Sequence, residues 1–205
     1  MSTGLCLMYV FPTFVECTSL YVLTAPQFDD IRGQQVPDPY HRFSFSAGSH
    51  VVSQQMTNST PTSGSRMLQI DPLSGTQIGV RLQINNPCFL FALKSIRMGC
   101  TTREKWCTFI VTGLRWDGVR NTELGNEIIT VQSCPSFSSC TLPTIALPPA
   151  LGTGLTSFNI EPQDGQTSWI DDVQIGWTDN GCAAATCRSQ VPNTAKRHIR
   201  WGVRG

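Results

Sequence analysis

The sequence predicts an all-β protein built as an antiparallel β-sandwich. Short apolar runs rich in Val, Ile, Phe and Thr recur between turn residues, and no long helical period is visible. In the segment Thr167–Trp177, the side chains of Trp169, Val173, Ile175 and Trp177 recur at even spacing. A period of two indicates a strand with one buried face. Roughly nine or ten such strands at this spacing are typical of a sandwich.

The expected strands follow one another along a single domain, which we place at residues 27–189. The runs that predict them are Arg42–Ser46, His50–Gln54, Met67–Ile70, Gln77–Ile84, Phe89–Ile96, Cys107–Leu114, Glu127–Gln132, Leu142–Leu147, Leu155–Ile160 and Ser168–Trp177. Turn residues such as Asn85, Asn86 and Pro87 separate these runs. Residues 190–205 form a basic tail that we expect to be disordered.

Residues 1–26 form an apolar N-terminal segment. Its core, residues 5–15, is too short to span a bilayer. It is either the hydrophobic region of a signal peptide or the product of a mispredicted start, since a basic leader is missing and Pro12 interrupts the run. No other stretch is long and apolar enough to cross a membrane, so we expect no membrane span.

The composition favours an extracellular protein over a nucleic-acid binder. Charged residues make up 14% of the 205 residues, while Ser and Thr make up roughly a fifth. The net charge of +1 hides a basic C-terminus, because five of the 15 basic residues follow from Arg188 onward. The remainder carries ten basic and 14 acidic residues, or 10 − 14 = −4. A short basic tail is more often solvated chain than a nucleic-acid site, so no nucleic-acid partner is expected.

The nine cysteines predict disulfide bonds. Three near pairs, each able to close a small loop, are Cys100 with Cys107, Cys134 with Cys140 and Cys182 with Cys187. Zinc binding is the alternative, but there is no CxxC motif and the three histidines lie away from the cysteines. Cys88 is then the odd one out, either buried or paired with Cys6 or Cys17.

Several segments together resemble a known group of domains. The segments are Phe28-Asp29-Asp30, the run 36–45 that contains Pro37-Asp38-Pro39-Tyr40, the runs 91–96, 107–115 and 155–158, and Trp169–Val173. This pattern resembles a poorly characterised group of fungal secreted proteins with a galactose-binding-like jelly-roll domain. The resemblance implies a jelly-roll β-sandwich and an extracellular or cell-wall setting. It carries no established activity.

Two pairs of carboxylates are candidate metal ligands. Related jelly-roll modules often hold one Ca²⁺ at the edge of the sandwich, and by that resemblance the ligands would be Asp29, Asp30, Asp171 and Asp172. Calcium takes six to eight oxygens, so two carboxylates and several carbonyls would suffice. In the alternative, one Asp of each pair faces solvent and the other accepts hydrogen bonds from a turn or from an arginine such as Arg32.

Aromatic residues next to polar groups are candidate carbohydrate ligands. Trp116 lies in an expected loop at a strand end with Arg115 and Asp117 beside it, and Tyr40 is a further candidate. Trp169 and Trp177 have the same parity along one strand, so we expect both on one face and in the core. We also expect Trp106, next to Cys107, in the core.

The sequence favours a binding protein over an enzyme. Glutamates near expected loops could act in glycoside hydrolysis, but no GxSxG elbow, HExxH motif or phosphate loop is present. We therefore expect a secreted, non-catalytic jelly-roll domain that binds polysaccharide or glycoprotein glycans outside the cell or in the cell wall. The alternatives are a purely structural or adhesive wall protein without a small ligand, and a glycan-active hydrolase.

Overall fold

The structure is a computed structural model of the whole chain. It describes residues 22–24, 28–31, 34–36, 43–46, 49–53, 59–60, 66–70, 72–73, 75–80, 87–102, 104–134, 140–163 and 165–190. The pairings expected for Cys6 and Cys17 lie outside these residues, as does most of the N-terminal segment.

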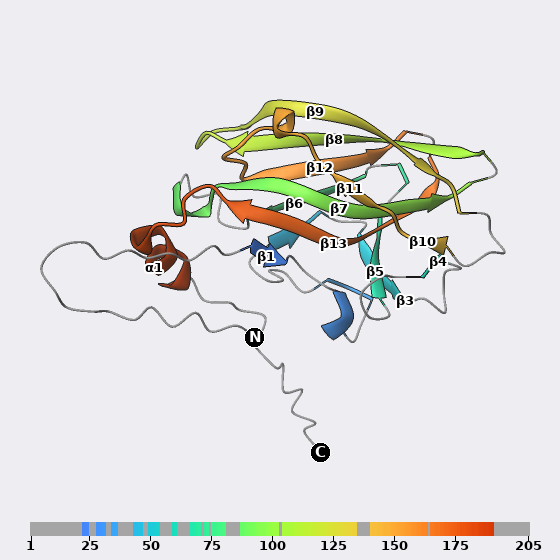
Figure 1. Cartoon of the computed structure of the whole chain (residues 1–205), viewed down its shortest axis with the longest axis horizontal. Coiled ribbons are helices and arrows are strands. Elements are labelled where there is room, and N and C mark those ends of the chain that lie inside the picture. Colours follow the sequence, from blue (N-terminus) through green and yellow to red (C-terminus); the bar gives the residue numbers. More distant parts are fainter. Residues whose placement is uncertain are drawn as a thin grey trace, which may run out of the picture.

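Two antiparallel sheets pack face to face (Figure 1). Sheet A has the strand order β11 (Thr144–Ala146), β7 (Phe91–Thr101), β13 (Thr167–Trp177), β5 (Arg66–Ile70) and β3 (His50–Ser53), and β1 (Val22–Thr24) also pairs with β13. Sheet B has the order β2 (Phe43–Phe45), β6 (Thr76–Val80), β12 (Ser157–Pro162), β8 (Trp106–Trp116) and β9 (Asn121–Gln132). A short parallel pair joins β4 (Ser59–Thr60) to β10 (Cys140–Thr141). The predicted antiparallel jelly-roll sandwich is confirmed.

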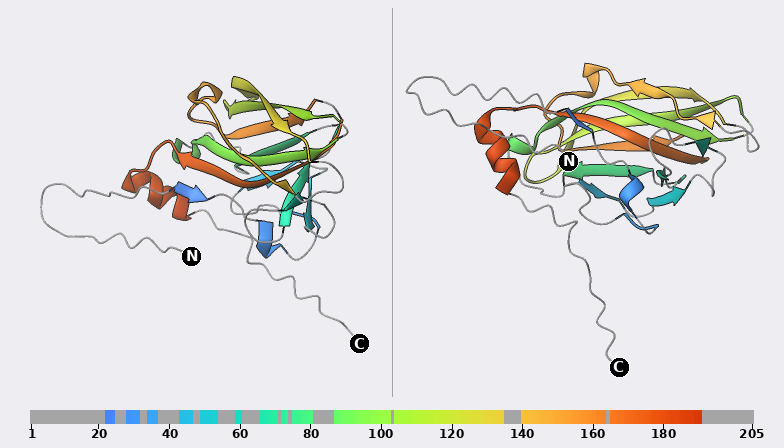
Figure 2. Two further views of the ribbon diagram at one scale, coloured as in Figure 1. Left: turned by 45° about the vertical axis from the view of Figure 1, so that its right-hand side comes forward. Right: turned by 60° about the horizontal axis from the view of Figure 1, so that its bottom comes forward.

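The hydrophobic core lies between the two sheets because alternate side chains of each strand point inward. Phe91 of sheet A and Phe109 and Phe158 of sheet B are completely buried there. The rings of Phe91 and Phe158 meet edge to face with centroids 6.3 Å apart. Figure 2 shows the two layers from two further sides. The remaining side chains of each strand of sheet B therefore point away from the core and form the outer face of that sheet.

Each of the ten predicted runs overlaps a strand, but β9 is longer than expected. It begins at Asn121 instead of Glu127, and its first four residues are exposed. The polar residues of this edge strand give no apolar alternation from which its start could be predicted. The structure also contains elements that the sequence did not predict: helix α1 (Cys182–Gln190) and the 3₁₀ turns η1 (Phe28–Asp30), η3 (Pro87–Phe89) and η4 (Pro149–Leu151).

A β-bulge in β13 explains the Asp-Asp interruption of its apolar pattern. The pairing of β13 with β7 shifts register between Asp171 and Gln174 and shifts back between Gln174 and Ile175, and Asp172 has φ +42°. Asp tolerates this left-handed conformation better than most residues do. Within this irregular stretch the core-facing positions of β13 change from even numbers, such as Ile170, to odd numbers, such as Ile175. Trp177 consequently joins the main core, whereas Trp169 packs in a smaller cluster with Val52, Met67 and Leu142. Both tryptophans are buried as predicted, but the expectation that they share a face is wrong.

A long-range disulfide bonds helix α1 to η3, the turn that precedes β7. Cys187 pairs with Cys88 in η3, 99 residues away, so the predicted pair of Cys182 with Cys187 is wrong and Cys88 is not unpaired. Cys182 is also disulfide-bonded, and its partner is not among the described residues. The buried Arg188 donates hydrogen bonds to the carbonyls of Cys88 (2.7 Å) and Asp179 (2.8 Å) and lies over the Trp177 ring. These contacts hold α1 on one end of the sandwich (Figure 1).

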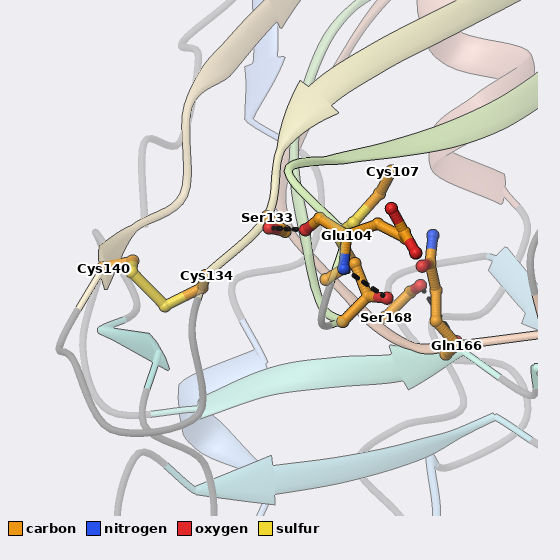
Figure 3. The surroundings of a disulfide bond; sticks show 9 residues. Glu104, Cys107, Ser133, Cys134, Cys140, Gln166 and Ser168 are labelled. Atoms are coloured by element: carbon orange, nitrogen blue, oxygen red, sulfur yellow. Dashed lines mark hydrogen bonds between the residues drawn. A yellow bond between two sulfur atoms is a disulfide. The ribbon is translucent and has the colours of Figure 1, made fainter.

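Two short-loop disulfides were predicted correctly. Cys100 pairs with Cys107 across the turn between β7 and β8, and Cys134 pairs with Cys140 after β9. The Cys134 amide donates to the Cys100 carbonyl at 2.9 Å, which joins the two bridges. Figure 3 shows Ser133, beside Cys134, donating to the carbonyl of Glu104 in the same turn. The disulfides therefore stabilise the end of the sandwich opposite α1 through neighbouring backbone segments.

Two glycines let η4 cover the inner side of β8 and β9. Gly113 and Gly125 are cross-strand partners. A side chain at either position would collide with backbone atoms of η4, namely the Leu151 and Ala150 carbonyl oxygens respectively. Because η4 occupies this inner side, the outer face of the two strands stays uncovered by it.

Among the described residues, no helix has both the length and the apolar character that crossing a bilayer requires.

Candidate functional site: a groove on the outer face of sheet B

The outer face of sheet B is lined by polar side chains in cross-strand rows. Phe109 and Val111 of β8 point into the core, so Thr108, Ile110 and Thr112 point outward. The strand registers place partners beside them on the same face. One such row runs across four strands and comprises Gln77, Asn159, Thr112 and Asn126. Hydroxyl and amide groups are both donors and acceptors, so this face can exchange hydrogen bonds with a polyhydroxylated ligand.

A groove of about 300 Å³ crosses one end of this face. Its lining includes Ser44 of β2, Gln77 and Gly79 of β6, Ser157 of β12, Trp116 of β8 and Asn121 of β9. The groove thus draws residues from all five strands of sheet B, which hold its lining on rigid backbone. The lining combines the apolar residues Trp116, Phe45 and Val80 with several uncharged hydrogen-bonding groups. Such a site is suited to a neutral, polar ligand with apolar patches.

Hydrogen bonds behind the lining fix its side chains. The Trp116 amide donates to Oγ1 of Thr156 at 2.7 Å, and the Gln77 side-chain amide donates to Oγ of Ser157 at 3.2 Å. The Gln77 backbone amide donates to Oγ of Ser46 at 2.9 Å. Thr156 is buried and its hydroxyl also donates to the Leu114 carbonyl. The groove is therefore largely preformed, which limits the ordering that a ligand would have to impose.

Of the four predicted ligand residues, Trp116 lines the groove. Asp117 instead closes the β8–β9 turn, where its Oδ1 accepts the Val119 amide at 2.8 Å and the Arg120 amide at 2.9 Å. These two backbone hydrogen bonds lower the pKa of the Asp117 carboxyl below its usual range, and the one from Arg120 has the larger effect. The guanidinium of Arg115 lies beside Gly154 and is not part of the lining. Tyr40 lies outside the described residues.

Trp106 is on the surface, so its predicted place in the core is wrong. Its side chain is 49% exposed at the start of β8, while its neighbour Cys107 is completely buried. Alternation along the strand accounts for the difference, since adjacent residues take opposite faces. The Nζ atom of Lys105 lies 5.4 Å from the centre of the Trp106 ring, a cation–π contact.

The two Asp pairs take part in contacts with the protein. Oδ1 of Asp29 accepts the backbone amide of Arg66 at 3.0 Å, and Oδ2 of Asp172 pairs with Nε of Arg97 at 3.2 Å. Asp171 is buried and Asp30 is exposed at the end of η1. Within the described residues, three or more acidic, His or Cys side chains nowhere gather in a group that could hold a metal. A calcium ion here would need mostly backbone oxygens. Calcium binding at these residues stays a prediction.

Two carboxylates share the outer face of sheet B but lie far apart. Glu161 is the cross-strand partner of Ile110, and Glu123 is that of Leu114 on the other side of β8. Strand spacing and rise place their backbones about 16 Å apart. Glycosidase carboxylates work at about 5 to 9.5 Å. Each of the two accepts a hydrogen bond from an amide, Asn126 for Glu123 and Asn159 for Glu161.

The sequence profile of one protein family, described as Domain of unknown function (DUF7371), matches residues 18–188. The chain belongs to this family. The match covers the described sandwich from β1 to the greater part of α1. No curated protein matches the chain.

Solved structures similar to this DUF7371 domain include two carbohydrate-binding modules and one protein of another family. A xylan-binding domain of carbohydrate-binding family 22 shares 15% identity over 66% of this chain and 86% of its own, with a TM-score of 0.43. The family 11 carbohydrate-binding module of Clostridium thermocellum Lic26A-Cel5E shares 9% identity over 78% of this chain and 96% of its own, with a TM-score of 0.38. A DUF4465 family protein from Bacteroides caccae shares 13% identity over 63% of this chain and 73% of its own, with a TM-score of 0.42. At these identities the likeness concerns the fold.

Most lining residues of the DUF7371 groove escaped prediction from the sequence. Ser44, Gln77 and Ser157 lie inside strands, whereas the candidate ligands were sought in loops. Their signal was the polar half of each alternating pattern, which by itself indicates only a solvated face. Knowledge of the strand order is needed to see that these polar positions lie side by side.

Proposed function

We propose that this domain is a secreted, non-catalytic module that binds polysaccharide in the groove on sheet B. The observation that carries the proposal is the lining itself: Trp116 beside hydroxyl and amide groups from adjacent strands, in a hollow of about 300 Å³. A sugar ring presents C–H groups on its faces and hydroxyls at its rim. Trp116 offers an apolar platform for the faces, and Gln77, Ser157 and Asn121 offer partners for the hydroxyls.

The disulfides support an extracellular setting. Bridges persist in oxidising compartments and are rare in the cytosol, and this domain has three described pairs plus the bonded Cys182. The wide separation of Glu123 and Glu161 supports a binding role over hydrolysis on this face. A cell wall or an extracellular matrix rich in glycans is the natural setting for such a module.

Retention on insoluble polysaccharides tests the proposal. The oxidised protein is mixed with chitin, β-glucan, cellulose, xylan and mannan, and the bound fraction is measured. We expect retention on at least one of them, and Trp116→Ala should lower the affinity about tenfold, since a buried aromatic contact contributes about 1.4 kcal/mol. Val119→Ala is the matched control, because Val119 is 83% exposed in the adjacent turn. Absence of retention on every polysaccharide would favour the structural or adhesive role.

A further inference from the structure

Outward residues of β8 and β9 continue the groove along the strands. The outward side chains of β8 and β9, from the Trp116–Asn121 pair at one end to the Trp106–Gln132 pair at the other, form a surface that we call the β8–β9 strip. Between these ends lie the cross-strand pairs Thr112–Asn126, Ile110–Ile128 and Thr108–Thr130. The pairing of β8 with β12 keeps one register from Phe109 to Leu114, so alternation along this part of β8 is unbroken. From Trp106 to Trp116 the strip covers the 11 residues of β8, and the ten steps between its ends correspond to about 33 Å.

Large apolar side chains on this strip have no role in the core. Trp106 is 49% exposed and Ile128 is 66% exposed. An exposed tryptophan is uncommon on a solvated sheet face, because it leaves apolar surface in water. Trp106 lies at the far end of the same face from Trp116, and threonine hydroxyls and the Asn126 amide lie between them. The strip therefore repeats the chemistry of the groove, an aromatic platform next to hydrogen-bonding groups.

The charges on this face select against an acidic ligand. Glu123 and Glu161 both lie on the outer face, and each accepts an amide hydrogen bond. Lys105 is the cation at the Trp106 end, where its ammonium group lies over the indole ring. A polyuronate chain that lay over Glu123 and Glu161 would be repelled by both carboxylates. A neutral chain could instead donate its hydroxyl protons to these two carboxylates.

We infer that the β8–β9 strip binds an extended, uncharged polysaccharide chain, whose sugars contact Trp116 in the groove and Trp106 at the other end. The inference rests on the proposed function and specifies its ligand as an internal stretch of a long chain. The same chain would lie in the groove and continue over Ile128, because groove and strip share one sheet face.

Calorimetric titration with oligosaccharides of increasing length tests the inference. The probes are cello-, xylo-, chito- and manno-oligosaccharides from disaccharide to octasaccharide, with polygalacturonate as the acidic probe. We expect affinity to rise with length until the chain reaches both tryptophans, and polygalacturonate to bind no more tightly than a disaccharide. Trp106→Ala should weaken the longest probe about tenfold and leave disaccharide binding unchanged. Trp106→Tyr should restore most of the loss, and Val119→Ala should bind as the unaltered protein does.

Two outcomes separate this inference from the proposed function. Equal affinity for short and long probes, with sensitivity to Trp116→Ala but not to Trp106→Ala, would overturn the extended strip and keep the groove. Failure of every probe to bind would overturn both. Because Trp106 is half exposed, its replacement should leave the melting temperature nearly unchanged, which a thermal scan of each variant checks.

Discussion

Gly79 and Ser157 face each other as cross-strand partners of β6 and β12, so closely that a Cβ atom at Gly79 would lie 2.6 Å from the Ser157 Cβ. Both residues line the groove. The missing side chain at Gly79 therefore lets the two strands pack normally and keeps the floor of the groove open.

Gly79→Ala should accordingly weaken both folding and binding. An extra methyl group in so tight a contact destabilises by about 1 to 3 kcal/mol. Ser157→Gly removes the colliding Cβ, so the double variant should recover stability relative to Gly79→Ala alone. Urea unfolding of the two single variants and the double variant measures this coupling. Additive effects of the two changes would show that the contact is not the cause.

The long-range disulfide should stabilise the domain more than a short-loop bridge does. In the chain-entropy account a bridge that closes about 100 residues contributes about 4.7 kcal/mol, and one that closes a few residues contributes about 2 kcal/mol. The separations here are 99 residues for Cys88–Cys187 and 6 for Cys134–Cys140. We expect the Cys88→Ala/Cys187→Ala variant to lose more free energy of unfolding than Cys134→Ala/Cys140→Ala, as measured in urea. Equal losses would contradict the entropic account.

The Asp117 carboxylate should stabilise the β8–β9 turn only where it is ionised. Its pKa is lowered in the folded protein by the backbone amides of Arg120 and Val119. A lowered folded pKa adds stability above the unfolded value of about 3.9, and that stability is lost as the pH falls through the folded pKa. The melting temperatures of the protein and of Asp117→Asn should differ at neutral pH and converge in acid. A constant difference at all pH values would refute the assignment.

The calcium hypothesis makes a separate demand on thermal stability. Chelation by EDTA must lower the melting temperature, because a ligand that binds the folded state alone stabilises it. Asp30→Ala must remove this sensitivity, while Glu104→Ala, an exposed carboxylate in another turn, serves as the control. A melting temperature that EDTA leaves unchanged would assign both Asp pairs to the fold.

Alternation along single strands could be predicted from the sequence, whereas contacts between distant residues could not. Apart from β1, the strands of both sheets overlap the predicted runs, because apolar and polar residues alternate in most of these runs. The irregular stretch around Asp172 makes the predicted common face of Trp169 and Trp177 wrong, because the core-facing positions of β13 change there from even to odd numbers. Spacing suggested Cys182 as the partner of Cys187, but in the folded chain Cys187 is bonded to Cys88, which lies 99 residues away. The groove depends on strand order, which alternation does not encode.

The bridge between Cys88 and Cys187 closes a covalent ring that contains β7 to β13. A single protease cut inside this ring, for example at the exposed Val119 of the β8–β9 turn, would not release a fragment. The two pieces would remain joined through the bridge and packed in one sandwich. A nicked molecule would run as one band on a gel without reductant and as two bands with it. In an environment rich in proteases, this ring would let the domain survive a cut in this exposed turn.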